Sequence, residues 1–173
     1  MASSLAHVMV VAGTRREWAE LSEPRWRRLA DELGAVVADA GGAWLTFRAY
    51  EHGIADPTAR WHLTTDDGRC TVLIDPFGDG RERFAAAMRE LPPGSPVDEK
   101  AVAGVLYEPA DVEPDLVLVL GPSTRLPPSL VWELAYGELV FLPVGLAELC
   151  PDHLRAAIDD FHGRRRRFGG LDS

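Results

Sequence analysis

The sequence lacks the features that mark secreted, metal-binding and membrane-spanning proteins. Its two cysteines, Cys70 and Cys150, lie far apart and without the spacing of a metal site. One disulfide could join them, but two free thiols in a reducing cytosol are the preferred interpretation. No apolar run approaches the roughly 20 residues that span a bilayer, and the first residues lack the basic segment and apolar length of a secretory signal. We therefore expect a cytoplasmic protein without a transmembrane segment.

An excess of positive charge is also absent. The net charge is −9, which argues against a nucleic-acid partner because such binding needs a basic face. The hydrophobic content of 46% and the charged content of 26% are those of an ordinary soluble globular protein. We find no internal repeat and no low-complexity tract, and 173 residues correspond to one domain with a core of its own. A single domain over residues 1–173 is therefore predicted.

Short apolar runs alternate with segments of helical periodicity along the chain. An apolar run bounded by turn residues fits a buried strand, and strands that alternate with helices indicate an α/β fold. The predicted strands cover residues 7–12, 43–50, 70–74, 116–120 and 140–144, with a hairpin across Asp66–Arg69. The predicted helices cover residues 17–23, 24–40, 81–91, 98–106, 130–141 and 151–161. We expect a central, mostly parallel sheet flanked by helices.

The stretch from Asp115 to Phe141 holds the strand, loop and helix on which the prediction depends most. Its apolar run ends at Gly121, and Pro127-Pro128 block a helix until Ser129. Ser129 is suited to cap a helix that extends from Leu130 to Phe141. Because open α/β sheets bind ligands at the carboxyl ends of their strands, this loop is the expected position of the fold's active site.

Two other loops carry residues that could bind or react. Gly13-Thr14-Arg15-Arg16 joins a strand to a helix, where N–H groups and arginines could hold a phosphate, although a solvated basic turn is the favoured interpretation. Glu51-His52 could form an acid/base pair, but no partner stands at a diagnostic spacing, which favours a polar loop. The remaining histidines and the acidic turns have neither zinc nor calcium spacing. The sequence therefore predicts no metal site.

Two charged features remain in the C-terminal part. Glu138 lies in an apolar segment, where a buried carboxylate would need a partner or a metal; a partly exposed residue at a helix end is the alternative. Arg164 to Arg167 form the densest charge of the chain and precede Phe168-Gly169-Gly170. Because arginine binds diphosphate bidentately and glycine permits unusual backbone shapes, this tail is either an ordered hook or a solvated terminus.

The C-terminal half resembles the signature of cis-prenyltransferases, the undecaprenyl and dehydrodolichyl diphosphate synthases. The family segment reads, in outline, D-L-x-I-R-T-x-G-E-x-R-x-S-N-F-L-x-W-Q-x-x-Y-x-E-x-x-F, and it is matched at Arg125, Trp132, Tyr136 and Glu138. The other matching segments are residues 164–170 on R-E-R-R-F-G-G, 7–18 on H-x-A-x-I-M-D-G-N-G-R-W, 45–50 on L-T-L-Y-A-F, and 70–91 on the strand and helix around N-Y-G-G-R. The resemblance implies a shortened cis-prenyltransferase-like fold.

The departures from this pattern fall on the family's functional positions. Gly13 stands where the family has the catalytic aspartate that helps to hold magnesium diphosphate, and Val119 where it has a diphosphate-binding arginine. Further replacements are Glu17 for an arginine, Ser123 for a glutamate and Pro127 for a serine. The segment between Tyr50 and Cys70 replaces a longer family region whose helices wall the lipid tunnel. The resemblance therefore implies no catalytic residue and no magnesium in this chain's own site.

Heteromeric cis-prenyltransferases pair a catalytic subunit with a non-catalytic one of the Nogo-B-receptor type, which lends an R-x-G motif to the partner's site. Arg167-Phe168-Gly169 matches R-x-G, so the resemblance implies that Arg167 and the N–H of Gly169 orient isopentenyl diphosphate and Mg²⁺ in the partner's active site. We thus expect an accessory subunit of a heterodimer that condenses isopentenyl diphosphate with an allylic prenyl diphosphate. Trp132 and Tyr136 are candidate interface anchors, although both could equally belong to the core.

Two other functions stay open. The chain could be a catalytically inactive scaffold or a regulatory protein that binds a prenyl diphosphate, since a fold does not fix a function. It could also be an active homodimer on short prenyl substrates. Tight ligand binding without a partner would favour the former, and product made by the isolated chain from isopentenyl diphosphate with magnesium would establish the latter.

Overall fold

A computed structural model describes residues 5–50, 60–122 and 124–168. Their strands form one six-stranded sheet in the order β3-β4-β2-β1-β5-β6. The strands are β1 (His7–Ala12), β2 (Trp44–Ala49), β3 (Trp61–Thr64), β4 (Thr71–Asp75), β5 (Leu116–Leu120) and β6 (Glu138–Leu142). All neighbouring pairs are parallel except β3 and β4, which are antiparallel. The predicted mostly parallel sheet and the hairpin at Asp66–Arg69 are both confirmed.

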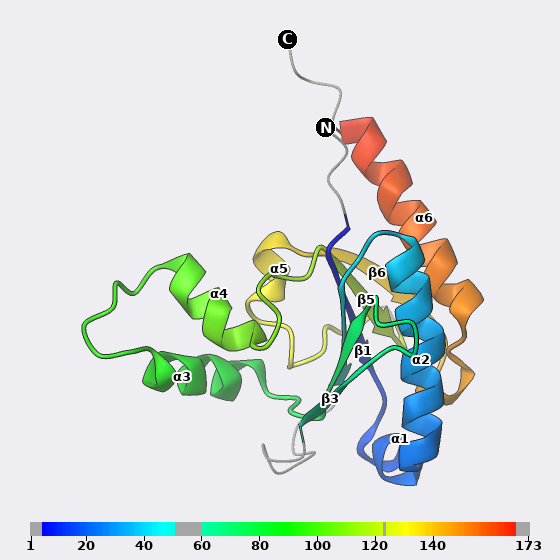
Figure 1. The fold of residues 1–173 in the computed structure, drawn as a ribbon, viewed down its shortest axis with the longest axis horizontal. Helices are drawn as coiled ribbons and strands as arrows, with labels where there is room; N and C mark the ends of the chain where they lie inside the picture. The colour runs from blue at the N-terminus through cyan, green and yellow to red at the C-terminus, as the bar shows by residue number, and fades with distance from the viewer. Residues whose placement is uncertain (1–4, 51–59, 123, 169–173) are drawn as a thin grey trace.

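Helices cover both faces of this sheet, as Figure 1 shows. They are α1 (Arg15–Glu20), α2 (Glu23–Asp39), α3 (Gly80–Glu90), α4 (Glu99–Tyr107), α5 (Glu133–Tyr136) and α6 (Pro151–Phe168), with a 3-10 turn, η2 (Leu146–Glu148). On one face α2 and α6 pack against each other and the sheet, and α3, α4 and α5 lie over the other face. Because a parallel sheet is buried on both faces, its strands must be apolar throughout.

The central strand β1 shows how the sequence meets this requirement. All six of its residues are buried. Val8 and Val10 belong to the core under α2 and α6, whereas Met9 and Val11 belong to the core under α3 and α4. Since each fully buried valine or methionine side chain contributes about 1.5–3 kcal/mol, this alternation ties both helical layers to one strand.

The division of the N-terminal helical segment was predicted correctly. Thr14 caps α1, and the chain turns at Ser22 before α2, which has Pro24 in its first turn. Proline is favoured there because its missing N–H has no partner within the helix. The helix ends before Gly41, whose φ of 92° is readily adopted by glycine alone.

The predicted helix from Leu130 to Phe141 is wrong. The helix in this region is the single turn α5, and β6 begins at Glu138 and pairs in parallel with β5. Ser129, the expected cap, is buried before the turn, and its hydroxyl has no hydrogen-bond partner among the described residues. The segment Leu139-Val140-Phe141 joins the sheet because pairing with β5 buries its apolar side chains, which overrides a weak helical pattern.

The C-terminal helix is longer than predicted. The expected end was Phe161, but α6 continues to Phe168. The arginines from Arg164 to Arg167 are therefore part of a helix, and the predicted ordered hook does not begin before Gly169. Gly169 and Gly170 lie outside the described residues.

Candidate functional site

The carboxyl ends of β1, β2 and β5 lie together at one edge of the sheet. The N–H of Tyr50, which follows β2, donates to the carbonyls of Ala12 and Gly13 at the end of β1. The hydroxyl of Tyr50 donates to the backbone carbonyl of Arg125 at 2.9 Å. The structure therefore brings the loop after β1 and the loop after β5 to the region where the sequence predicted an active site.

Gly13 occupies a position that is closed to any side chain. Its φ is 83°, in the left-handed region that other residues rarely adopt. A Cβ placed on Gly13 would lie 2.7 Å from Cδ1 and Nε1 of Trp18 and 2.8 Å from Cδ2 of Leu146. Trp18 is held in place because its indole N–H donates to the carbonyl of Ala12 at 2.8 Å. An aspartate could not replace Gly13 without displacing these neighbours.

The N-terminus of α1 is capped by the chain itself. Oε2 of Glu17 accepts hydrogen bonds from the N–H of Thr14 at 2.8 Å and from its hydroxyl at 3.0 Å. Oε1 of Glu17 accepts from the N–H of Leu146 at 3.2 Å. Arg16 pairs with Glu20, 2.6 Å away along the helix. A carboxylate thus occupies the end of the helix where a phosphate would bind, and this arrangement favours the capped turn over a phosphate site.

The loop after β5 offers few groups to a ligand. Val119 is fully buried in the core under α3 and α4. Arg125 is exposed, and Pro127 is buried. Ser123 lies outside the described residues, as do Glu51 and His52. The retained Arg125 is therefore a single surface cation in the described part of this loop.

Glu138 lies at the start of β6 and is partly exposed. Its carboxylate is 3.6 Å from Nε of Arg164, whose Nη2 is 2.6 Å from Asp160 on the same helix. The side chain of Glu138 is 23% exposed, so this pair is weakened by solvent. Arg164 links α6 to β6, and Arg167 follows three residues later in the same helix.

The two predicted interface anchors have different surroundings. Trp132 is half-buried and stacks on Phe84 of α3, with ring centroids 5.8 Å apart. Tyr136 is 56% exposed, and its hydroxyl donates to Oε1 of Glu99 at 3.0 Å. Trp132 thus belongs mainly to the core, whereas Tyr136 presents most of its ring at the surface.

A buried ion network that the sequence analysis missed lies beneath α3 and α5. Arg48 of β2 is fully buried, with Nη1 2.9 Å from Oε1 of Glu133 and Nη2 3.1 Å from Oδ2 of Asp75. Nη1 of Arg83 on α3 is 3.4 Å from the same Glu133 oxygen. Burial of such charges is costly unless each is paired. Here one arginine joins β2 to both β4 and α5.

The charges of this network stabilise each other. Burial alone raises the pKa of the Glu133 carboxyl, but Arg48 and Arg83 outweigh it and hold that pKa below its ordinary value. The pKa of Asp75 is likewise lowered, because Arg48, Arg83 and Arg60 outweigh the effect of its burial. Both carboxyls are therefore ionised at neutral pH.

A signal for this network was present in the sequence. Arg48 is the one charged residue of a strand that is apolar except for Thr46, and it lies on the face opposite Leu45 and Phe47. Glu138, expected to be either buried with a partner or partly exposed, is partly exposed, and the buried glutamate of this region is Glu133. The sequence did not distinguish the burial of the two glutamates, because the region was expected to form one helix.

The described residues offer no cluster of three or more metal-ligating His, Cys, Asp or Glu side chains. Both cysteines are free thiols, and burial raises the pKa of Cys70 to about 12. In the same part of the chain, no helix is long and apolar enough to cross a membrane. The site at the carboxyl edge of the sheet therefore lacks a carboxylate set for magnesium in the described residues.

The sequence matches the family model of putative undecaprenyl diphosphate synthases over residues 59–169. Isoprenyl transferase 2 of Bradyrhizobium diazoefficiens is 34% identical over 117 residues, which are 63% of this chain and 46% of that protein. The tritrans,polycis-undecaprenyl-diphosphate synthase (geranylgeranyl-diphosphate specific) of Thermococcus kodakarensis is 33% identical over 98 residues, 52% of this chain and 37% of that protein. The chain spans less than half the length of these curated relatives.

Two solved structures share the fold. A probable undecaprenyl diphosphate synthase from Campylobacter jejuni superposes with a TM-score of 0.62 over 94% of this chain and 97% of its own, at 15% identity. The lavandulyl diphosphate synthase of Lavandula x intermedia, in complex with dimethylallyl diphosphate, gives a TM-score of 0.64 over 92% of this chain and 95% of its own, also at 15% identity. At this identity the likeness establishes the fold alone.

Proposed function

Because the chain belongs to the undecaprenyl diphosphate synthase family, the cis-prenyltransferases, we propose that it is the non-catalytic subunit of a heterodimeric member. A catalytic partner binds the allylic prenyl diphosphate, Mg²⁺ and the growing chain. This subunit contributes the tail that begins at Arg164, together with an interface. The reaction of the pair is the condensation of isopentenyl diphosphate with an allylic prenyl diphosphate.

The closed position at Gly13 is the observation that carries this proposal. The family pattern has its catalytic aspartate there, and Trp18 and Leu146 leave no space for one. Val119 adds a second loss, since it buries an apolar side chain where the pattern has a diphosphate-binding arginine. The family pattern uses both residues to bind the diphosphate substrate, and this chain has neither. An active site in this chain is therefore disfavoured.

The same edge of the sheet is also poorly suited to magnesium diphosphate. The Glu17 carboxylate accepts from the N–H and hydroxyl of Thr14 at the start of α1 and from the N–H of Leu146, and a like charge there opposes an anionic ligand. The described residues do not gather carboxylates around a metal position. In addition, β2 and β3 are joined by residues 50–60 alone, a length that cannot supply the helices of a lipid tunnel. The residues present do not fit the group that the family's chemistry requires.

The C-terminal tail keeps residues of the family pattern that can bind diphosphate, namely those of the R-x-G motif. Arg167 lies near the end of the eighteen-residue helix α6, which packs on α2 and β5 through the core. A charge-assisted, bidentate contact from Arg167 to diphosphate, with the N–H of Gly169 as a second donor, would stabilise the negative charge that develops on the leaving group.

Exposed apolar side chains in the segment that joins β5 to β6 support the heterodimer. They are those of Leu126, Val131, Leu134 and Tyr136. Among the described residues, β6 is an edge strand of the sheet and pairs with no strand other than β5. Exposed apolar side chains and a free strand edge are both features of protein–protein interfaces.

Co-expression of the chain with a catalytic cis-prenyltransferase of the same organism tests the proposal. We expect the two proteins to co-purify, native mass spectrometry to show one copy of each, and the pair to make product faster than the partner alone. If the proteins neither co-purify nor gain activity together, the proposal fails. Tight binding of a prenyl diphosphate by the isolated chain would instead favour a regulatory protein.

A further inference from the structure

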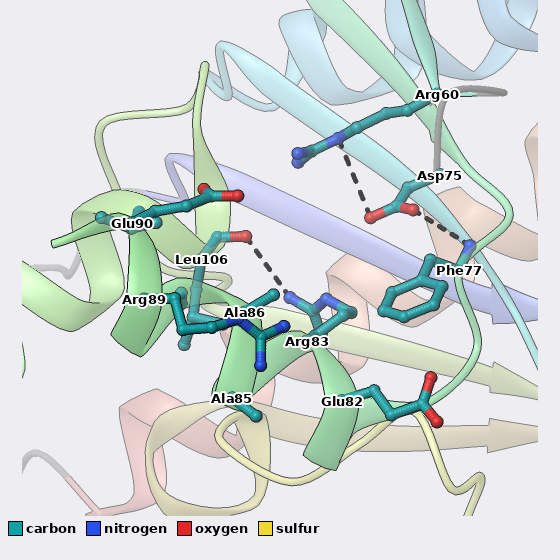
Figure 2. Close-up of a pocket in the computed structure, with 12 residues that line it drawn as sticks. Arg60, Asp75, Phe77, Glu82, Arg83, Ala85, Ala86, Arg89, Glu90 and Leu106 are labelled. Atoms are coloured by element: carbon teal, nitrogen blue, oxygen red, sulfur yellow. Dashed lines mark hydrogen bonds and ion pairs between the residues drawn. The ribbon is translucent and has the colours of Figure 1, made fainter. Parts of the chain in front are cut away.

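A pocket opens on the face of the sheet that carries α3 and α4, away from α6. Its volume is about 590 Å³, which lies in the range of small-molecule sites. Six of its twelve lining residues are apolar, namely Phe77, Ala85, Ala86, Ala87, Val105 and Leu106. Figure 2 shows Arg60 reaching into this space from the start of β3 and Arg83 from α3, with Asp75 beside them.

The ion network beside the pocket holds one more cation than anions. Its cations are Arg48, Arg60 and Arg83, and their partners are the carboxylates of Asp75 and Glu133. Arg48 makes the two shortest contacts, at 2.9 and 3.1 Å. Arg60 is the most weakly paired cation, because its Nε is 3.9 Å from Asp75, beyond the range of a hydrogen bond, and its side chain is 33% exposed.

Arg83 is the most deeply placed cation that lines the pocket. It is 7% exposed, and both of its hydrogen bonds, to Glu133 and to the carbonyl of Leu106, are long at 3.4 Å. Burial lowers the pKa of Arg83 to about 10, aided by the nearby Arg48, so the guanidinium remains charged at neutral pH. A buried cation with long contacts gains from a further anionic partner.

The rim carries charges of both signs. Arg89, Glu82 and Glu90 line it, and all three are exposed to solvent. Exposed charges are screened by water and salt, whereas charges at the buried end act through a lower dielectric. The buried Arg83 therefore contributes more to the electrostatic preference of the pocket than the rim charges do, and Arg60, with its side chain 33% exposed, is only partly screened.

We propose that this pocket binds a small amphipathic anion, a carboxylate or monophosphate on a short hydrocarbon chain. The headgroup contacts Arg60 and Arg83, and the hydrocarbon packs on Phe77, Val105 and Leu106. Such a ligand supplies the missing negative charge and covers the apolar wall at once. The proposal does not depend on the accessory role, because α6 lies on the opposite face of the sheet, where it packs on α2 and β5.

Calorimetric titration of the full chain tests the proposal with four probes. Octanoate and citronellyl monophosphate represent the two sources of an anionic headgroup, and 1-octanol and inorganic phosphate each carry one half of the ligand. We expect at least one amphipathic anion to bind at least tenfold more tightly than both half-ligands, since each half forms only part of the contacts. Which anion binds more tightly assigns the headgroup.

Two variants and a control localise the binding. Arg60→Gln should weaken binding of the preferred anion about five- to tenfold, and Ala86→Trp should abolish it by filling the pocket. Arg81→Gln changes an exposed cation of the same helix that does not line the pocket, and should leave the affinity unchanged. The circular dichroism spectrum of each variant confirms that it is folded. Equal binding of octanol and octanoate, equal binding by the Ala86→Trp protein, or no binding of either anion would overturn the proposal.

Discussion

Gly13 combines a left-handed backbone with a lack of space, and the two effects can be separated by substitution. Gly41 has a similar φ of 92°, but a Cβ placed there would meet no atom within 4 Å. The two glycines are therefore a matched pair in which only one is enclosed. Their comparison measures how firmly the position of the family's aspartate is closed.

We predict that Gly13→Ala lowers the free energy of unfolding by about 3 kcal/mol and that Gly41→Ala lowers it by about 1 kcal/mol. The shared cost is the unfavourable backbone conformation of about 1 kcal/mol, and the additional cost at Gly13 is the displacement of Trp18 and Leu146. Urea denaturation followed by tryptophan fluorescence measures both values. Equal losses in the two variants would mean that the position is not closed.

His7 makes the stability of the fold depend on pH. Its ring is buried, with Nδ1 2.9 Å from the carbonyl of Val112 and Nε2 2.9 Å from Oγ1 of Thr46. The carbonyl can only accept, so Nδ1 carries the proton and Nε2 accepts from the Thr46 hydroxyl. Burial of the ring lowers the pKa of His7 to about 4.

A lowered histidine pKa means that the unfolded chain binds a proton that the folded chain does not. This difference exists between the folded value of about 4 and the unfolded value of about 6.5. The stability contributed by His7 is therefore fully present above about pH 6.5 and is lost progressively as the pH falls toward 4, by roughly 3 kcal/mol in total.

We predict that His7→Gln flattens the dependence of unfolding free energy on pH between pH 6.5 and 4.5. His62→Gln is the control, because His62 is exposed and should leave the slope unchanged. An NMR titration of the unmodified protein gives a second measurement, in which the His7 ring should remain neutral down to about pH 5. A His7 signal that titrates near pH 6.5 would contradict this account.

At the scale of elements, the sequence predicted a strand or helix correctly where its apolar residues are the ones buried in the structure. The five residues of β5 and the six of β1, all apolar except His7, are buried on both faces, so their apolar runs identify them as strands without further information. The segment from Leu130 to Phe141 failed because its apolar spacing fits a helix while its last part pairs with β5. The strand expected over residues 140–144 overlaps β6 (Glu138–Leu142), but its pairing with β5 is a contact between distant residues, which the local pattern does not record.

The position of the candidate site could be predicted from the sequence, but the side-chain contacts within it could not. The loops after β1 and β5 were correctly placed at one edge of the sheet, because parallel strands share that edge. The side chains that close Gly13 come from α1 and from η2, more than a hundred residues apart. The partners of Arg48 come from β4 and α5. Such contacts depend on the complete fold and leave no periodic signal in the sequence.

Trp132 precedes the short helix α5 and packs on the core, whereas Tyr136 ends the helix at the surface. Substitution of each residue should therefore change the free energy of unfolding differently. We predict that Trp132→Ala lowers the free energy of unfolding by about 2–3 kcal/mol, because it removes the stack on Phe84. Tyr136→Ala should change stability by no more than about 0.5 kcal/mol, since the ring is exposed. If α5 lies in the heterodimer interface, Tyr136→Ala should instead weaken the complex about tenfold or more.

Thermal unfolding of each variant and the dissociation constant of the pair provide the two measurements. Val97→Ala serves as a control, because Val97 is 65% exposed and lies in the connector between α3 and α4. It should change neither quantity. If Tyr136→Ala leaves the dissociation constant unchanged, α5 is not part of the interface.

At the scale of the whole molecule, the two faces of the sheet have separate roles. The face under α2 and α6 holds the larger apolar core and supports the C-terminal helix. The opposite face holds the ion network and the pocket. The edge between them, where the family pattern has its catalytic aspartate, is closed by Trp18, Leu146 and Glu17. Under the proposed function, the tail is then the part of this chain that would act on a partner's substrate.

The turnover of the reconstituted pair with unmodified and Arg167→Ala chains tests this account most directly. We predict no product from the isolated chain with isopentenyl diphosphate, an allylic diphosphate and Mg²⁺, and full activity from the pair. Arg167→Ala should reduce turnover about 100-fold, as expected for loss of one charged donor to the reacting diphosphate, with an unchanged complex mass. Arg155→Ala, which removes an exposed arginine from the same helix, should have no effect. Product from the isolated chain, or equal turnover with Arg167→Ala, would contradict the account.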